Sequence, residues 1–377
     1  ASSTSITSIL TALYFHWLEP GDRVAVKPQS SPAFHAVQYL LGRLPRPYMT
    51  QLRAYGGIQP YPSRTKDPDA VDFSTGSVGL GAVAPAFAAA VYRYAGAHFG
   101  PLPERRFVAL MGDAELDEGS VWEALLDDSL QGLGNLLWIV DLNRQSLDRV
   151  VPGIRAARLK RLFEDLGWQV IEAKYGRKLQ ALFGQPGGET LRRRIDRMAN
   201  EEYQALIRQD GAQIRRSLLG EKGQGRDELE RLLAGIADAE MPALLSNLGG
   251  HDMEELIAKL AEVDDRRPTI LFAYTIKGWG LPLAGHPLNH AQLMSPEQIE
   301  GLRAAYGIPA GDDWPLFDAG SPEGKLCAER AGALYGGDGT PSVALAPEDV
   351  PPDLRLPSPP LTSTQDAFGR LLIQLAD

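Results

Sequence analysis

The sequence predicts an α/β fold with a doubly wound, mainly parallel sheet flanked by helices. Residues 107–143 read as strand, helix and strand, because two apolar, β-rich runs enclose a segment whose apolar residues recur at helical spacing. A strand–helix–strand unit of this length forms a parallel sheet with a right-handed crossover. Residues 268–276, PTILFAYTI, read as a further buried strand. Together these segments predict one sheet whose strands end at a common edge.

Length and composition bound the class of protein. The 377 residues suffice for one large α/β domain with insertions or for two smaller domains. A net charge of −10 argues against a nucleic-acid surface and against a polybasic membrane contact. The single cysteine, Cys327, leaves no internal disulfide framework, so the cytoplasm is the default location. No apolar run reaches the ~18 residues that suggest a membrane-spanning helix.

The chain before residue 107 divides into short elements. We expect an amphipathic helix over 1–18, a strand over 23–27 and a helix over 32–42, which places His35 on a helix surface or interface. Residues 43–70 lack periodicity and predict an ordered, irregular loop.

Three glycines, Gly76, Gly79 and Gly81, introduce a long Ala-rich helix. Glycines at the start of a helix let a ligand approach the backbone closely and leave N–H groups available to an anion. Small residues also permit tight helix packing, so the glycine run alone is weak evidence for a ligand site.

Asp113 and Asn143 follow two consecutive strands, so both residues are expected at the carboxyl edge of the sheet, where ligands bind in such folds. With a main-chain carbonyl from the loop after Asn143, they would form a site of hard oxygen donors suited to Mg²⁺ or Ca²⁺. Small residues Gly112 and Ala114, and a helix beginning near Ser120, would admit an anion to backbone N–H groups. The pattern predicts a metal–diphosphate site, although each residue alone is also common in an ordinary turn or cap.

The Gly-Asp-x motif and an Asn about thirty residues later form a thiamine-diphosphate signature. The segments MGDAELDEG and VDLNRQSLD closely resemble those of the homodimeric pyruvate dehydrogenase decarboxylating component, and transketolase is a more distant relative. The resemblance implies thiamine diphosphate and Mg²⁺ as cofactors, with Asp113, Asn143 and Gln145 as metal ligands. The familiar motif is Gly-Asp-Gly, so Ala114 is a mild departure.

The resemblance also implies roles for residues outside the two strand ends. Gly76, Ser77 and Val78 would lie against the aminopyrimidine and thiazolium rings, and Lys277, in YTIKGWG, would face the cofactor. Further cofactor or catalytic positions implied by the resemblance are Gly112, Ala114, Glu115, Glu118 and the loop residue His290. Glu118 would link paired sites across a dimer, and His290 would orient substrate or contact a partner. Gln29 stands where the family has a histidine that reaches the cofactor. Glutamine could bind the cofactor by donating a hydrogen bond to a diphosphate oxygen, but it cannot shuttle a proton near neutral pH.

The remaining chain predicts a division into domains. Residues 1–310 are expected to form the diphosphate- and Mg²⁺-binding domain, with a charged helical insertion over 176–246. Residues 311–362 are rich in Pro, Gly and Asp and read as a linker. Residues 363–377 read as the first helix of a truncated or separate pyrimidine-type domain. His251 in the GGHD string is expected to be structural.

The leading hypothesis is a thiamine-diphosphate-dependent 2-oxo acid dehydrogenase component that supplies the diphosphate-binding half. It would decarboxylate a pyruvate-like acid and transfer the acyl group to a lipoyl group. The implied partners are a pyrimidine-domain chain or protomer, in a dimer or heterotetramer, and a lipoyl-carrying acyltransferase. Two alternatives stay open: a transketolase-like two-carbon transfer enzyme, and a non-catalytic half that binds cofactor or partner.

Overall fold

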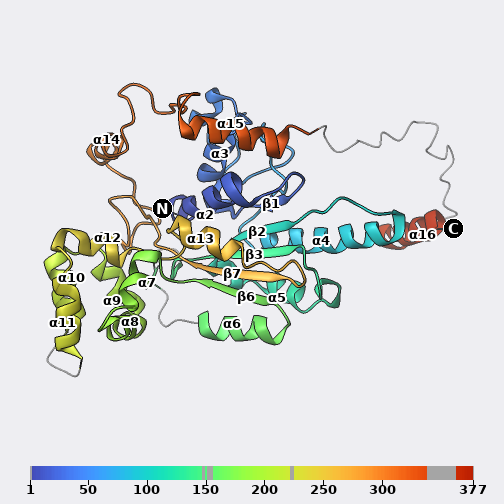
Figure 1. The fold of residues 1–377 in the computed structure, drawn as a ribbon. Coiled ribbons are helices and arrows are strands. Elements are labelled where there is room, and N and C mark those ends of the chain that lie inside the picture. The colour runs from blue at the N-terminus through green and yellow to red at the C-terminus, as the bar shows by residue number, and fades with distance from the viewer. Residues whose placement is uncertain (1, 147–148, 151–155, 221–224, 338–361, 377) are drawn as a thin grey trace. The chain divides into compact units, whose positions relative to one another are not determined.

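The computed structural model describes residues 2–146, 149–150, 156–220, 225–337 and 362–376. The chain divides into two compact units, Ala1–Gly336 and Gly337–Asp377, and each is described by itself. Figure 1 shows the fold of the larger unit, in which helices cover both faces of a central sheet.

The central sheet has five parallel strands in the order β1-β2-β3-β7-β6. Their bounds are Arg23–Ala25 (β1), Phe107–Gly112 (β2), Leu136–Leu142 (β3), Thr269–Tyr274 (β7) and Gln169–Ala173 (β6). The two central strands β3 and β7 are buried along their whole length, as expected for a sheet covered on both faces. The predicted parallel α/β fold is confirmed.

Alternate residues of the central strands belong to two different apolar cores. Met111, Trp138 and Phe272 pack on one face with helices α4 (Leu80–Phe99), α5 (Gly119–Leu125) and α6 (Ala156–Asp165). Leu110, Ile139 and Leu271 pack on the other face with α2 (Thr7–Ala12), α3 (Ser31–Leu40) and α13 (Met253–Leu260). The alternation follows from the two-residue period of a strand, which sends successive side chains to opposite faces.

The predicted N-terminal helix is present but broken into three pieces. They are α1 (Ser2–Ser5), α2 and a π-helical turn, η1 (Leu13–Trp17). Arg330 donates to the carbonyls of Tyr14 and Leu18 at the end of this segment. These bonds satisfy backbone acceptors that the end of a helix leaves without partners.

The strand–helix–strand unit runs as expected. Strand β2 leads into the 3₁₀ helix η4 (Asp113–Asp117), then into α5, the short 3₁₀ helix η5 (Asp128–Leu130) and β3. Beyond β3, the short antiparallel strands β4 (Gln145–Ser146) and β5 (Arg149–Val150) form a separate two-stranded sheet.

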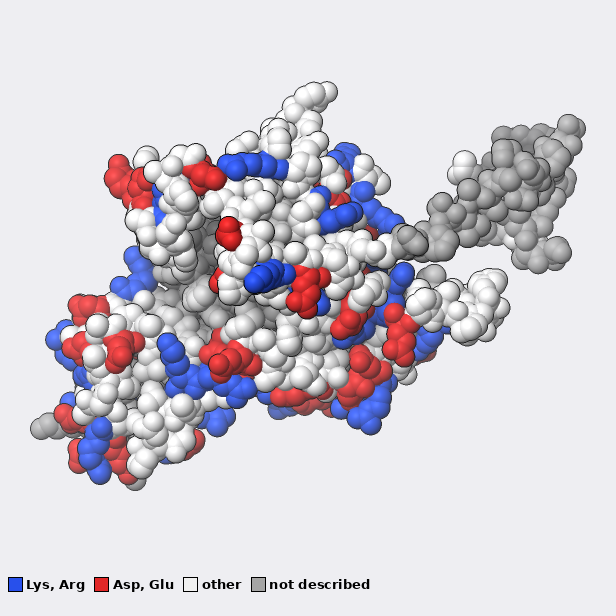
Figure 2. Space-filling view, turned by 45° about the horizontal axis from the view of Figure 1, so that its top comes forward, with Lys and Arg blue, Asp and Glu red and all other residues white. Residues whose placement is uncertain are grey.

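The expected insertion is a group of short helices. These are α7 (Arg177–Phe183), α8 (Gly188–Asp196), α9 (Asn200–Leu206), α10 (Gly211–Leu219), α11 (Arg226–Ala234) and α12 (Met241–Leu245). The side chain of Asp210 caps α10 by accepting from the backbone N–H of Gln213, and Asp252 caps α13 in the same way. Figure 2 shows blue and red side chains interleaved over the visible face rather than separated into patches of one sign.

Part of the expected linker is helical, so that prediction is wrong over α15 (Pro322–Tyr335). Ser321 caps this helix, Pro322 occupies its first turn, and Tyr335 hydrogen bonds to Gln38 of α3. Helix α14 (Pro296–Ala305) precedes it. The rest of the expected linker lies largely outside the described residues, and the helix expected at 363–377 is present as α16 (Thr364–Ala376).

Of the two places expected for His35, a helix surface or an interface, the structure excludes the exposed surface. His35 lies on α3 but is almost fully buried, and its Nδ1 is 2.6 Å from the carboxylate of Asp69 in the loop that covers this helix. Within the described part of the chain, no helix combines the length and apolar character needed to cross a membrane.

Candidate functional site

Three neighbouring strands of the sheet end in polar residues. Asp113 follows β2, Asn143 follows β3, and Lys277 lies three residues beyond the end of β7. Because these strands are adjacent and parallel, with Gly112 level with Asp141 and Leu142 level with Tyr274, their carboxyl ends form one edge. The structure therefore brings two of the three predicted metal ligands, Asp113 and Asn143, to the same edge as Lys277, the lysine expected to face the cofactor.

Asp113 is held by the loop that follows β3. Its Oδ2 accepts a hydrogen bond of 2.8 Å from the backbone N–H of Arg144. Arg144 has a φ of +60°, a left-handed conformation that a non-glycine residue rarely adopts outside constrained sites. Burial of the carboxyl group raises the pKa of Asp113 to about 7, and nearby Asp141 acts in the same direction, while the N–H of Arg144 and the ammonium of Lys27 oppose the shift.

Asn143 is buried directly beside Asp141. Its Nδ2 donates to Asp141 Oδ2 at 3.5 Å, and its main-chain carbonyl accepts from Gln204. Gln145, the third predicted metal ligand, is the first residue of β4, which lies beside η4. The side chain of Gln145 lies outside the described residues, so the structure places only its backbone.

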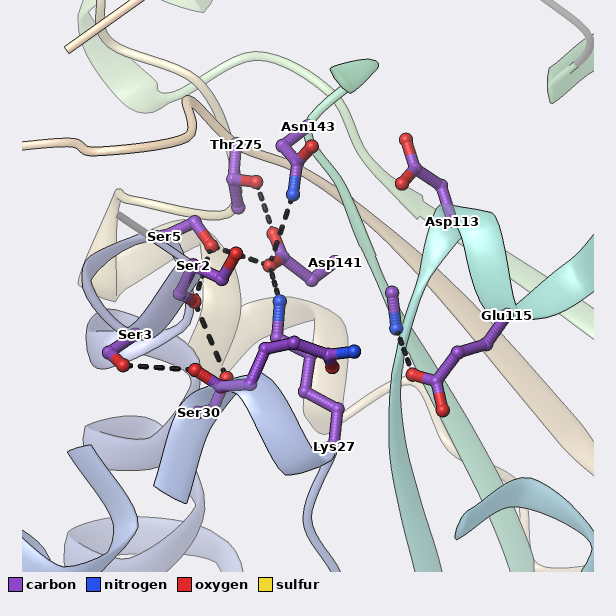
Figure 3. Close-up of polar contacts among 12 residues, drawn as sticks. Ser2, Ser3, Ser5, Lys27, Ser30, Asp113, Glu115, Asp141, Asn143 and Thr275 are labelled. Atoms are coloured by element: carbon purple, nitrogen blue, oxygen red, sulfur yellow. Dashed lines mark hydrogen bonds and ion pairs between the residues drawn. The ribbon is translucent and has the colours of Figure 1, made fainter. Parts of the chain in front are cut away.

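Sequence reasoning missed a buried ion pair at this edge, between Lys27 and Asp141. Asp141 has no exposed surface, and it accepts hydrogen bonds from the ammonium of Lys27 and from the hydroxyls of Ser5 and Thr275. Figure 3 shows these groups converging on the one carboxylate. Burial alone would raise the pKa of Asp141, but the ammonium and the hydroxyls hold it below its ordinary value. A lone carboxylate inside the apolar strand LLWIVDL was the signal that could have revealed it.

Lys277 is buried, with only 3% of its surface exposed, and does not behave as a surface lysine after a strand. Its main-chain carbonyl accepts from the amide of Asn289, which also donates to Leu283 and so closes the loop. His290 lies on this loop and is exposed, with its Nδ1 3.5 Å from the ammonium of Lys277. An ammonium in a turn at this edge suits a phosphate group.

His251 contacts the segment that follows β7. Its Nε2 accepts a hydrogen bond of 2.8 Å from the N–H of Ile276, and its ring stacks on Trp279 with centroids 4.4 Å apart. Burial lowers the pKa of His251 to about 3, so the imidazole stays neutral and can accept. The geometry agrees with the structural role expected from the sequence.

The glycine-containing loop lies against the same edge. Thr75 donates to the carbonyl of Val26 at the end of β1, and Ser120 donates to the carbonyl of Val78. Ser77 and Val78 are exposed, and Gly76 is partly exposed. Gly79 is the residue before α4 and has a φ of +79°. A Cβ at this position would meet Val121 Cγ2 at 2.8 Å.

Three other predicted residues occupy different surroundings. Gln29 is exposed on the 3₁₀ helix η2 (Pro28–Ser30), and its main-chain carbonyl accepts from Ser3. The carboxylate of Glu115 is buried and accepts a 2.8 Å hydrogen bond from the N–H of Gly112, which fixes the turn after β2. Glu118 is only partly buried and immediately precedes α5, next to Gly79.

The donors at this edge fit a hard divalent cation in type. Among the residues described, no three His, Cys, Asp or Glu side chains gather into a metal-binding group. The predicted set contains a single carboxylate, on Asp113, and takes its other oxygens from an amide and a main-chain carbonyl. The amide nitrogen of Asn143 faces Asp141, and the oxygen donors of the predicted set are of the kind that suits Mg²⁺ or Ca²⁺.

Comparison with known proteins agrees with this geometry. Residues 22–184 match the family described as "Transketolase, thiamine diphosphate binding domain". The chain is 29% identical to the pyruvate dehydrogenase E1 component of Pseudomonas aeruginosa over 386 residues, covering 94% of this chain and 42% of that protein. It is 30% identical to the E1 component of Cupriavidus necator over 330 residues, covering 83% and 36%.

Solved structures show the same fold. A transketolase from Campylobacter jejuni superposes with a TM-score of 0.56 at 19% identity, covering 87% of this chain and 42% of that one. A transketolase from Leishmania mexicana gives a TM-score of 0.54 at 17% identity, covering 87% and 40%. The chain thus spans about two fifths of the length of the relatives it matches. The chain is similar in sequence to the pyruvate dehydrogenase E1 components, part of it matches the thiamine diphosphate binding domain of transketolase, and it shares its fold with the solved transketolases.

Proposed function

We propose that this chain is the diphosphate- and metal-binding half of a thiamine-diphosphate-dependent 2-oxo acid dehydrogenase component. The observation that carries the proposal is the convergence of Asp113, Asn143 and Lys277 at the carboxyl ends of three adjacent parallel strands. Ligands bind at this edge in open α/β sheets. The similarity to E1 components over most of this chain favours the dehydrogenase over other uses of the fold.

Each residue at the edge has a definite task under this proposal. Asp113, Asn143 and the backbone of Gln145 would hold Mg²⁺, and Lys277 would neutralise the diphosphate. The exposed loop at 76–78 would line the cofactor rings, and His290 would face the substrate. When bound, thiamine diphosphate would supply the electron sink for decarboxylation of a 2-oxo acid.

A complete active site needs a further domain under the same proposal. The chain matches about two fifths of each E1 relative, and α16 would begin the pyrimidine-type domain or lead to it. A second chain or protomer would complete the site, in a dimer or heterotetramer, with Glu118 near the junction. A lipoyl-carrying acyltransferase would accept the acyl group. We place this assembly in the cytoplasm, in keeping with the single cysteine.

Calorimetric titration with thiamine diphosphate and Mg²⁺ tests the proposal. The full chain should bind the cofactor only with the metal, either alone or together with a chain carrying the pyrimidine-type domain. Asp113→Ala should abolish binding, because it removes the one carboxylate of the donor set. Asp117→Ala, in the same turn but exposed, is the matched control and should bind normally. If neither arrangement binds the cofactor, the proposal is wrong.

A second candidate is a half that binds the cofactor without turnover. This candidate is favoured by Gln29. The resemblance implies a histidine at this position, and the glutamine that replaces it has no titratable side chain. Decarboxylation of pyruvate by the assembled chains decides between the two. Metal-dependent binding without any release of CO₂ would favour the binding half.

A further inference from the structure

The proposed function assigns no role to the ion pair between Lys27 and Asp141. Both side chains are buried, and the hydroxyls of Ser5 and Thr275 complete the hydrogen bonds of the carboxylate. Removing two charges from water is costly, and apolar residues of similar volume commonly replace buried ion pairs without loss of stability. Stability alone therefore does not explain why this pair occupies the end of a central strand.

The position of Asp141 relates it directly to the candidate metal ligands. Asp141 pairs with Gly112 of the neighbouring strand, and Gly112 is the residue that precedes Asp113. Asp141 also lies two residues before Asn143, so both side chains leave β3 on the same side. Its Oδ2 accepts from the amide nitrogen of Asn143. This contact fixes which way the amide faces, and the amide oxygen is the atom a cation would use.

The same carboxylate also ties down the segment after β7. Thr275 donates to Asp141, and Thr275 is two residues before Lys277. Lys27, from the segment after β1, approaches from the other side. Three loops at the carboxyl edge are thus attached to one buried group, as the close-up in Figure 3 shows for Thr275, Asn143 and Lys27.

We infer that the buried acceptor at Asp141, held in place by Lys27, is the positioning unit of the metal-and-diphosphate site, acting through the amide of Asn143 and the turn before Lys277. This inference rests on the proposed function. In other metal sites, partners that orient the ligands contribute about 10–100-fold to metal affinity. Lys27 and Asp141 are positioning residues here, because neither is assigned a contact with the cofactor.

Two double variants of the full chain separate positioning from stability. Lys27→Met with Asp141→Leu replaces the ion pair by apolar side chains, whereas Lys27→Gln with Asp141→Asn removes both charges but keeps an acceptor at position 141. Urea unfolding should show that both variants fold. In calorimetry, the apolar variant should lose about 10–100-fold in Mg²⁺-dependent affinity for thiamine diphosphate, and the polar variant should stay close to the unmodified chain.

An apolar variant that folds and binds with unchanged affinity would overturn the inference. A second measurement needs no cofactor: NMR hydrogen exchange of the Asn143 side-chain amide, identified by its loss in Asn143→Asp. The amide should be protected in the unmodified chain and the polar variant, and exposed to exchange in the apolar variant. Equal exchange in all three would refute the positioning role. Failure of the unmodified chain to bind cofactor, with or without its partner chain, would instead refute the proposed function.

Discussion

At the carboxyl edge of the sheet Lys27 and Asp141 are buried against each other, whereas at the amino edge Arg105 and Arg106 border an open cleft of about 940 Å³. The cleft is also lined by Asp22 and Asp265, from the segments that enter β1 and β7. The chemistry of the sequence motifs lies at the opposite edge.

The two edges differ in how their charges are held. Arg106 pairs with Asp22 at 2.9 Å but keeps 20% of its side chain exposed, and it also lies over the ring of Trp17. Pairs with access to water contribute little to stability, because solvent screens them. Lys27 and Asp141 interact in a dry environment, where each lost partner leaves a costly charge. Fixed buried polar groups therefore mark the candidate site.

The largest expected effect comes from breaking the buried pair on one side. Asp141→Ala leaves the Lys27 ammonium buried without its counter-charge and should lower the free energy of unfolding by about 3–5 kcal/mol. Glu104→Ala, an exposed carboxylate at the amino-edge cleft, should change it by less than about 0.5 kcal/mol. Urea unfolding of both variants measures the contrast, and similar losses would show that the edges do not differ.

The second prediction concerns how the stability of the chain depends on pH, through His251 at the carboxyl edge. The folded-state pKa of His251 is about 3, below the ordinary value of about 6.5, so the unfolded chain binds a proton that the folded chain does not. The stability is therefore full above about pH 6.5 and falls by up to about 1.4 kcal/mol per unit as the pH drops toward 3.

His251→Gln keeps a side-chain acceptor and should flatten this acid-side slope by up to one proton. The unmodified chain is the reference for this slope. Urea unfolding between pH 7 and pH 4 gives both slopes. An unchanged slope in His251→Gln would contradict the buried, neutral imidazole.

The smallest contrast compares the two ends of α4. Gly79→Ala combines a left-handed backbone with a Cβ only 2.8 Å from Val121, and should cost about 1–3 kcal/mol. Gly96→Ala, near the other end and beside the amino-edge cleft, meets only Leu102 at 3.9 Å. That substitution should stabilise the helix by about 0.5–1 kcal/mol. Thermal unfolding measures both, and a stabilising Gly79→Ala would contradict the tight approach of α4 to α5.

Features written locally in the chain could be predicted from the sequence. The ends of β2, β3 and β7 followed from apolar runs that stop at polar residues, so Asp113, Asn143 and Lys277 were expected together at one edge. Adjacent parallel strands require this outcome once the strands are assigned. Their roles toward a cofactor remain proposals.

Features that depend on distant partners could not be predicted in the same way. Lys27 and Asp141 are separated by 114 positions, and no local pattern links them. The sequence did not decide between a surface and an interface position for His35, because its partner, Asp69, lies in an irregular loop. Helix α15 was hidden by flanking Pro, Gly and Asp residues, although Ser321 and Pro322 form a helix start signal that was available.

Through the hydroxyl of Ser5, the first helix helps to keep water away from the Lys27–Asp141 ion pair. The hydroxyl of Ser5, in α1, donates to Asp141 at 2.6 Å, and Ser5 itself is fully buried, so α1 packs against the ion pair. If α1 moved away, water would enter, and the effective dielectric constant around the pair would rise from about 4–20 toward about 80. The charges would then attract each other more weakly and cost less to separate. The strength of the attraction between these two buried charges thus depends on a helix of only four residues.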